Sequence, residues 1–264
     1  MIEMTSRTHT PSPDECTAIT HPEVGLNPMW VQPQQGQVYH LAGPGRSGTS
    51  MRPIAEYWVA HALAQQRVVH WVDGACRIDP SRLIPLLESR GADVEACLAK
   101  CYLSRGFTLH QLDRQLERLP DELKITRSPL VVVDGLLAMH EDDAISNLES
   151  RMLLRRHLRL LRGLAEQQQI AVVVITEASA TSRIQQRLVQ HVYRHAQNHL
   201  NGRWRGPRRR RTLQLRHPRS GLSGPWQPLH DPLQMRWKAS PQQHLRPTER
   251  SSAAQALPLH HREP

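Results

Sequence analysis

The apolar residues of this chain gather in short continuous runs, separated by longer segments with helical spacing. Three runs are rich in β-branched residues: 67–72, 129–134 and 170–176. The first is followed by an aspartate, Asp73, and the second ends in one, Asp134. Continuous apolar runs of this length are typical of strands that are buried on both faces of a parallel sheet. We therefore predict three interior strands.

The segments between these runs carry leucines three or four positions apart. Residues 109–123 have this spacing and predict an amphipathic helix, which Pro120 is expected to end or bend. Residues 148–167 predict a longer helix with a basic outer face. Strands that alternate with helices indicate an α/β fold, with a mostly parallel sheet and helices on both faces.

Residues 36–63 read as a short strand, a loop of glycine and small residues, and a helix. The loop has the glycine spacing of a phosphate-binding loop, in which backbone amides and the helix N-terminus surround an anion. Thr49 stands where that motif has its lysine, so the sequence leaves open whether ATP and Mg²⁺ still bind. The predicted nucleotide-binding residues are Gly43, Pro44, Gly45, Arg46, Ser47, Gly48, Thr49 and Ser50.

The apolar pattern is confined to about residues 36–216, which predicts one core domain. Residues 1–35 are polar and proline-rich and are expected to form a flexible arm. Residues 217–264 are rich in proline, histidine and glutamine and are expected to be a disordered tail. Cys97 and Cys101 have no second Cys or His pair at metal-site spacing, which favours buried thiols over zinc.

The chain is strongly basic, with 34 Lys and Arg against 24 Asp and Glu and a pI of about 10.3. This balance favours a polyanionic partner, DNA first, although a basic protein without such a partner remains the alternative. The chain has neither an apolar run long enough to span a membrane nor a signal-peptide core at its N-terminus. We therefore expect no membrane association and a cytoplasmic location, with the nucleoid if the cell is prokaryotic.

Six arginines fall within nine positions, 203–211, beside a tryptophan. Guanidinium groups neutralise phosphates, and an indole ring can stack on an unpaired base. A solvated, charged turn is the alternative interpretation. The predicted DNA-binding residues are Arg203, Trp204, Arg205, Arg208, Arg209, Arg210 and Arg211.

Four segments follow one another in a specific order: VDGACRIDPSRL (72–83), SRGFTLHQL (104–112), VVVDGL (131–136) and VVVITEA (172–178). Together with the loop, they resemble the RecA/RadA-type recombinases, a family of strand-exchange ATPases and accessory paralogues. The resemblance covers about residues 36–216 and implies a RecA-like P-loop core. It also implies Mg²⁺ ligation by Ser50 and Asp134.

Three polar groups of that family are replaced in this chain. Thr49 stands for the loop lysine, Ala75 for the acid that activates water, and Ala178 for the glutamine that senses the terminal phosphate. Phosphoryl transfer depends on positioning and charge stabilisation, so losing the cation and the acid should each slow hydrolysis by orders of magnitude. Arg46 is the one residue inside the loop that could offer a substitute cation.

Three functional hypotheses follow. The first is a divergent RecA-like protein that binds DNA and assists recombination or repair with weak or no ATP hydrolysis, together with a recombinase or repair-protein partner or as a homo-oligomer. The second is an active DNA-dependent ATPase whose missing cation comes from Arg46 or a neighbouring subunit. The third is a nucleotide-free interaction scaffold.

Overall fold

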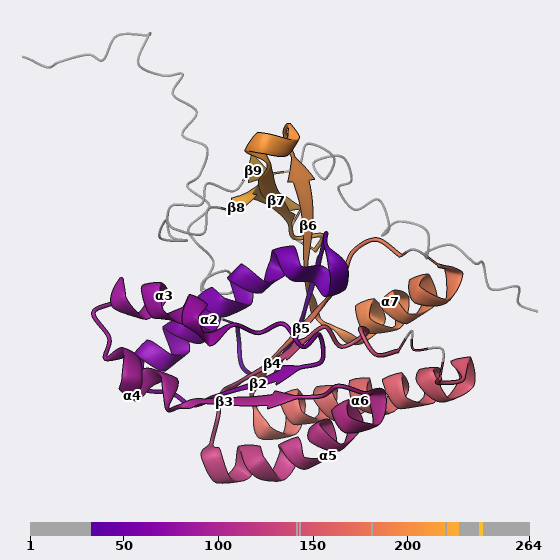
Figure 1. Ribbon diagram of the computed structural model, residues 1–264, viewed down its shortest axis with the longest axis horizontal. Helices are drawn as coiled ribbons and strands as arrows, with labels where there is room; N and C mark the ends of the chain where they lie inside the picture. The colour runs from indigo at the N-terminus through magenta and orange to yellow at the C-terminus, as the bar shows by residue number, and fades with distance from the viewer. Residues whose placement is uncertain are drawn as a thin grey trace, which may run out of the picture.

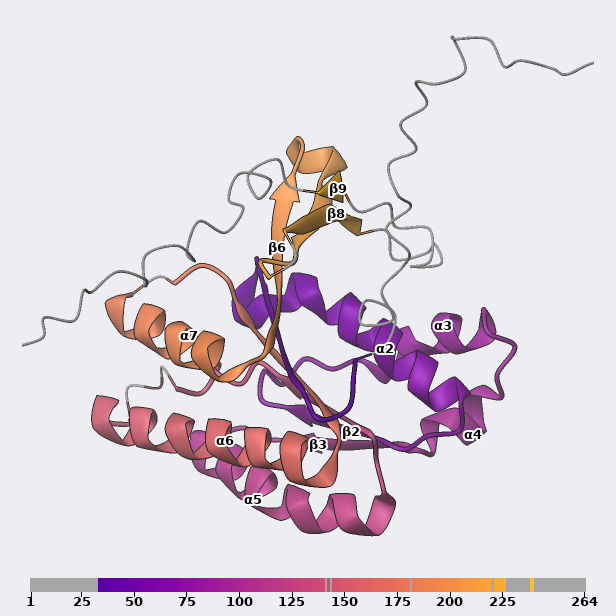
Figure 2. The ribbon, with the colours of Figure 1, turned by 180° about the vertical axis from the view of Figure 1, so that it is seen from behind.

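The computed structural model describes residues 33–140, 142, 144–180, 182–219, 221–226 and 238–239, which form a nine-stranded sheet between two layers of helices (Figures 1 and 2). Six strands run parallel, and three are added antiparallel at one edge. In spatial order the parallel strands are β3 (Cys101–Arg105), β2 (Val69–Asp73), β4 (Leu130–Asp134), β5 (Ala171–Glu177), β1 (Val38–Gly43) and β6 (Asn198–Arg205). The antiparallel strands are β7 (Thr212–Arg216), β8 (Leu222–Trp226) and β9 (Lys238–Ala239).

The α/β fold predicted from the sequence is confirmed. The three apolar runs form β2, β4 and β5, and their residues are buried on both faces of the sheet. In register, Asp73 at the end of β2 lies beside Asp134 at the end of β4. The carboxyl ends of these strands therefore bring two acidic side chains to the edge of the sheet where open α/β folds bind ligands.

The helices cover both faces of the sheet. One layer holds α2 (Arg52–Ala64), α3 (Ile84–Glu88) and α4 (Val94–Leu98), and the other holds α5 (Leu109–Thr126), α6 (Asn147–Gln168) and α7 (Arg183–His195) (Figures 1 and 2). Short 3-10 turns are η2 (Arg46–Met51), η3 (Pro80–Leu83) and η4 (Arg208–Arg210). Trp58 and Trp71 anchor the core on the α2 side, while leucines of α5 and α6 fill the core on the other side.

Side-chain caps fix where the long helices begin. The hydroxyl of Thr108 accepts a hydrogen bond from the Gln111 amide at the start of α5, and Ser146 and Ser182 cap α6 and α7 in the same way. The helix does not end at Pro120, since α5 continues to Thr126.

Two sequence-based boundaries differ in the structure. The strand expected around residues 98–103 is divided into the end of α4 and the strand β3, because Asp93 caps a short helix just before it. The core also extends beyond residue 216, since β8 pairs with β7 and buries Trp226, so the predicted tail boundary is too early. Residues 1–32 of the predicted arm, and residues 227–264 apart from 238–239, lie outside the described residues.

Candidate nucleotide loop and basic sheet face

The predicted phosphate loop connects β1 to α2 and packs tightly against β5. Ser47 and Gly48 have left-handed backbone angles, with φ of 58° and 75°. A Cβ atom at Gly48 would lie 2.1 Å from the carbonyl oxygen of Thr176. Glycine is therefore required at this position by both the backbone angle and the close approach of β5.

The loop is closed by its own hydrogen bonds. The Gly48 amide donates to the carbonyl of Gly45 at 2.8 Å, and the Ser50 amide donates to the carbonyl of Pro44 at 3.2 Å. A Cβ atom added at Gly45 would lie only 2.4 Å from the hydroxyl oxygen of Thr49. In a loop that holds phosphate, such amides point at the anion instead. Two of the predicted amide donors are thus already used within the loop.

Arg52, the first residue of α2, reaches the acid at the end of β4. Its Nε lies 2.5 Å from Oδ2 of Asp134, and its Nη1 donates to the carbonyl of Arg77 at 3.3 Å. Both side chains are buried, with 7% and 0% of their surface exposed. Burial raises the pKa of Asp134 above its ordinary value, and the Arg52 guanidinium opposes that rise.

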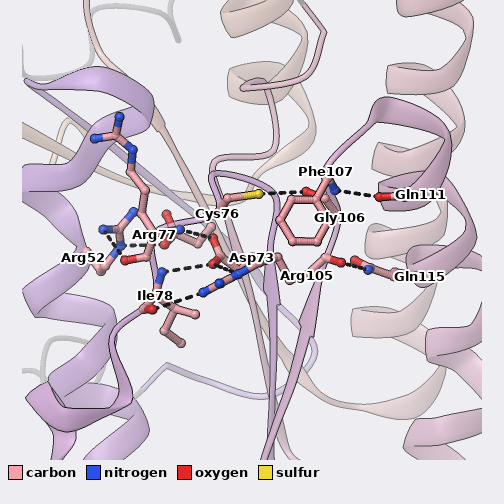
Figure 3. A network of polar contacts seen from close by, with 11 residues as sticks. Arg52, Asp73, Cys76, Arg77, Ile78, Arg105, Gly106, Phe107, Gln111 and Gln115 are labelled. Carbon is pink, nitrogen blue, oxygen red and sulfur yellow. Dashed lines mark hydrogen bonds and ion pairs between the residues drawn. The ribbon is translucent and has the colours of Figure 1, made fainter.

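Asp73, the acid at the end of β2, is held by a separate network (Figure 3). Its two carboxylate oxygens accept hydrogen bonds from the backbone amides of Arg77 and Ile78, and Oδ2 lies 3.0 Å from Nε of Arg105. Asp73 thus bonds the backbone that follows β2. The third buried acid here, Glu56, pairs with Arg82 at 3.0 Å.

The residues at this site do not fit Mg²⁺-ATP in the arrangement described. Ser50 and Asp134 supply oxygen atoms of the kind Mg²⁺ prefers, but Asp134 is already paired with Arg52. Ala178 lies beside the loop, its amide donating to the carbonyl of Gly43, and Ala75 lies beside Asp134. Within the described part of the chain, no group of three or more His, Cys, Asp or Glu residues could hold a metal ion.

The predicted DNA-binding arginines lie on and around the hairpin of β6 and β7. Strand alternation places Arg203 and Arg205 on the sheet face that carries His40 and His199, and Arg216 of β7 shares this face through the ladder. All three arginines are exposed. We call the side chains of this surface the basic sheet face: Asn201, Arg203, Arg205, Thr212, Gln214 and Arg216.

Trp204 is separated from this surface. It alternates with Arg203 and Arg205 and is paired with Leu213, which belongs to the core on the α2 side. The structure therefore does not bring Trp204 onto one face with these two arginines. Arg209, Arg210 and Arg211 are exposed in the turn between the two strands, where Arg208 also lies.

An aromatic pair lies at the start of the basic sheet face. The rings of Tyr193, on α7, and His199, on β6, are stacked with centroids 3.9 Å apart, and Tyr193 is 44% exposed. Beneath them His40 is fully buried and shares a hydrogen bond of 2.7 Å with the hydroxyl of Thr176.

The stretch of chain that contains this hairpin is free of acidic residues. Residues 178–230 contain eleven arginines and no aspartate or glutamate. On α7, burial lowers the pKa of His191, and the cations of Arg155 on α6 and Arg194 on α7 lower it further.

The sequence analysis missed two of these features. Arg52 follows Ser50 by two positions, but its pairing with Asp134 joins residues 82 positions apart in the chain. The acid-free stretch was visible in the sequence as an absence of aspartate and glutamate, and it is broader than the cluster at 203–211. None of the described helices is both long and apolar enough to cross a membrane.

Comparison with known proteins agrees with the fold. The Rad51 family model matches residues 59–193, just over half of the chain. The chain is similar to a DNA repair and recombination protein RadB from Pyrococcus abyssi, with 26% identity over 143 residues, which cover 54% of this chain and 58% of the relative. It is also similar to the RadB of Pyrococcus horikoshii, with 30% identity over 115 residues, which cover 44% of this chain and 49% of the relative.

A third RadB, from Pyrococcus furiosus, is 24% identical over 143 residues, covering 54% of this chain and 60% of the relative. The chain thus spans about half to three-fifths of the length of these relatives. The family match extends from α2 to α7, and so includes the strand ends that carry Asp73 and Asp134. The chain belongs to the Rad51 family of RecA/RadA-type recombinases.

Proposed function

We propose that this chain is a divergent RecA-like protein that binds DNA and assists recombination or repair without efficient ATP hydrolysis. The observation that carries the proposal is the basic sheet face, on which Arg203, Arg205 and Arg216 are exposed. It lies in a stretch, residues 178–230, that has eleven arginines and no aspartate or glutamate. The relatives are named as DNA repair and recombination proteins, which agrees with this role. It would place the chain with DNA in the cytoplasm.

The spacing of the arginines suits a phosphate backbone. Alternate residues on a strand lie roughly 7 Å apart and point to the same side of the sheet. Arg203 and Arg205 are such alternate residues, so their guanidinium groups can contact different phosphates of one DNA strand. Arg216 lies on the neighbouring strand of the same face.

Slow or absent hydrolysis follows from the site at the loop. The chain lacks three groups that the family uses. Thr49 does not supply the cation, Ala75 does not supply the acid that activates water, and Ala178 does not supply the amide that senses the terminal phosphate. The closed loop and the Arg52–Asp134 pair support the same proposal. ATP and Mg²⁺ are therefore proposed to be dispensable for DNA binding.

The test is fluorescence anisotropy with labelled single-stranded and duplex oligonucleotides from 50 to 300 mM salt. The variant Arg203→Gln/Arg205→Gln/Arg216→Gln should bind both less tightly. Each lost phosphate contact lowers the magnitude of the slope of log affinity against log salt by about 0.7 for single strands and about 0.9 for duplex. Losing three contacts should therefore lower that magnitude by about 2 for single strands and by nearly 3 for duplex.

A matched variant removes three exposed cations from α5 and α6, on the other side of α7: Arg118→Gln/Lys124→Gln/Arg162→Gln. It has the same net charge as the first variant and should keep the wild-type slope. Salt-independent binding, or an equal loss in both variants, would contradict the proposal.

The nucleotide-free scaffold remains a second candidate, favoured by the closed loop. It predicts no DNA binding in this titration and a thermal midpoint that ATP does not shift. Its partner would be a recombinase, a repair protein or another copy of the chain, and size-exclusion chromatography with light scattering tests the last of these. DNA-stimulated phosphate release that Asp134→Ala abolishes would instead support the active ATPase.

A further inference from the structure

The acids at the carboxyl ends of β2 and β4 are each matched by one guanidinium group. Asp134 pairs with Arg52, Asp73 with Arg105, and Glu56, one turn further along α2 from Arg52, with Arg82. The three carboxylates are almost fully buried. Each of these three carboxylates thus has one guanidinium partner, and Arg77 adds a further cation close to Asp134.

The Arg52 pair stands apart from the other two. Arg82 and Arg105 are half exposed, whereas the Arg52 side chain is 7% exposed. Its attachment at the first position of α2 places the guanidinium at the end of β4, on the Asp134 oxygen that a cation would neutralise. The second oxygen of Asp134 and the hydroxyl of Ser50 are buried and have no hydrogen-bond partner among the described residues.

Buried polar atoms without partners are uncommon, and carboxylate and hydroxyl oxygens are the ligands that a hard divalent cation prefers. With Arg52 in place, however, the carboxylate is already neutralised, and a second cation would be repelled by the guanidinium. The same two residues are those that the family resemblance assigns to Mg²⁺. A buried guanidinium therefore stands beside the carboxylate to which the resemblance assigns the metal.

We propose that Arg52 is a resident counter-ion that takes the place of a divalent metal at Asp134, and that removing its charge creates a metal site at Ser50 and Asp134. The inference is independent of DNA binding, since it is measured on the protein without DNA. An ordinary structural ion pair would differ in one respect, because its loss would lower stability without creating affinity for metal.

The experiment measures Mn²⁺ binding by electron paramagnetic resonance, together with thermal midpoints in EDTA and in 10 mM Mg²⁺. Wild-type protein should bind no Mn²⁺ at this site, and Mg²⁺ should not shift its midpoint. Arg52→Ala should unfold at a lower temperature in EDTA, bind Mn²⁺, and gain about 3–5 °C once Mg²⁺ reaches ten times its dissociation constant. Arg52→Gln keeps the stem and an amide donor without the charge, and gives the same test if the alanine variant does not fold.

Two further variants locate the effect. Asp134→Asn, added to Arg52→Gln, should abolish the acquired Mn²⁺ binding. Arg156→Gln frees a different carboxylate, Asp113 between α5 and α6, and should acquire none. Asp134-dependent Mn²⁺ binding by the wild-type protein would overturn the proposal, and so would a folded Arg52 variant that acquires no metal affinity.

Discussion

Two buried histidines predict that the protein loses stability in mild acid. His40, on β1, and His140, which follows β4, have 0% and 3% of their surface exposed. Burial lowers the pKa of each to about 3, with His199 and His157 respectively lowering it further as like charges. Both rings are therefore neutral in the folded protein at pH 5 and above.

The size and sign of the effect follow from proton linkage. An unfolded histidine binds a proton near pH 6.5, whereas these two bind theirs near pH 3 in the folded state. The unfolded state thus binds more protons between these values, so stability is fully present above pH 6.5 and is lost as pH falls toward 3. Between pH 7 and pH 5 each histidine should cost about 2 kcal/mol, and the two together about 4 kcal/mol.

Urea unfolding followed by circular dichroism at pH 7, 6 and 5 measures this loss. His40→Gln keeps a hydrogen-bonding group near Thr176 but cannot titrate, so its stability should fall by about 2 kcal/mol less than that of the wild type over this range. His110→Gln, at an exposed position on α5, is the matched control and should retain the wild-type dependence. Carboxylates titrate alike in the wild type and the variant, so they cancel in the difference between the two proteins. An unchanged pH dependence in His40→Gln would refute the reasoning.

Three further substitutions test the loop and the core by chemical denaturation. Gly48→Ala should lower the free energy of unfolding by at least about 3 kcal/mol, because its Cβ would overlap the Thr176 carbonyl and φ is 75° there. Gly163→Ala, in open space on α6, is the control and should raise the free energy of unfolding by about 0.5–1 kcal/mol. A tolerated Gly48→Ala would show that the loop is not packed on β5. Leu112→Ala, at a fully buried position of α5, should cost about 2–5 kcal/mol, and a cost below 1 kcal/mol on the same scale would contradict its place in the core. Asp73→Asn should cost about 1–3 kcal/mol, because it removes the charge of a buried carboxylate that pairs with the half-exposed Arg105 and leaves two amides less well satisfied, and full retention of stability would refute that network.

The sequence predicted the parts of the fold that depend on local pattern. The strands β2, β4 and β5 are continuous apolar runs, and burial on both faces of a parallel sheet demands that composition. The strand β8 was missed because its five residues include Gly224 and Pro225, which argue against a strand unless it lies near a sheet edge.

The candidate site was less predictable because its contacts join distant positions. Nothing in the local pattern around Arg52 indicates that its guanidinium pairs with an acid 82 positions away. The position of Trp204 was open for a different reason. A cluster of arginines around a tryptophan suggests one surface, but once the segment is a strand, alternation moves the indole to the other face.

Arg52 belongs to the same chain as Asp134. The effective concentration of the Arg52 charge at Asp134 is therefore fixed by the fold. A dissolved ion or nucleotide fills a site in proportion to its level in the cell, whereas a tethered guanidinium fills its site in every molecule. Under the proposed function, such a family member would have no nucleotide cycle to time its release from DNA. Its occupancy of DNA would then be set by the number of copies present and by ionic strength.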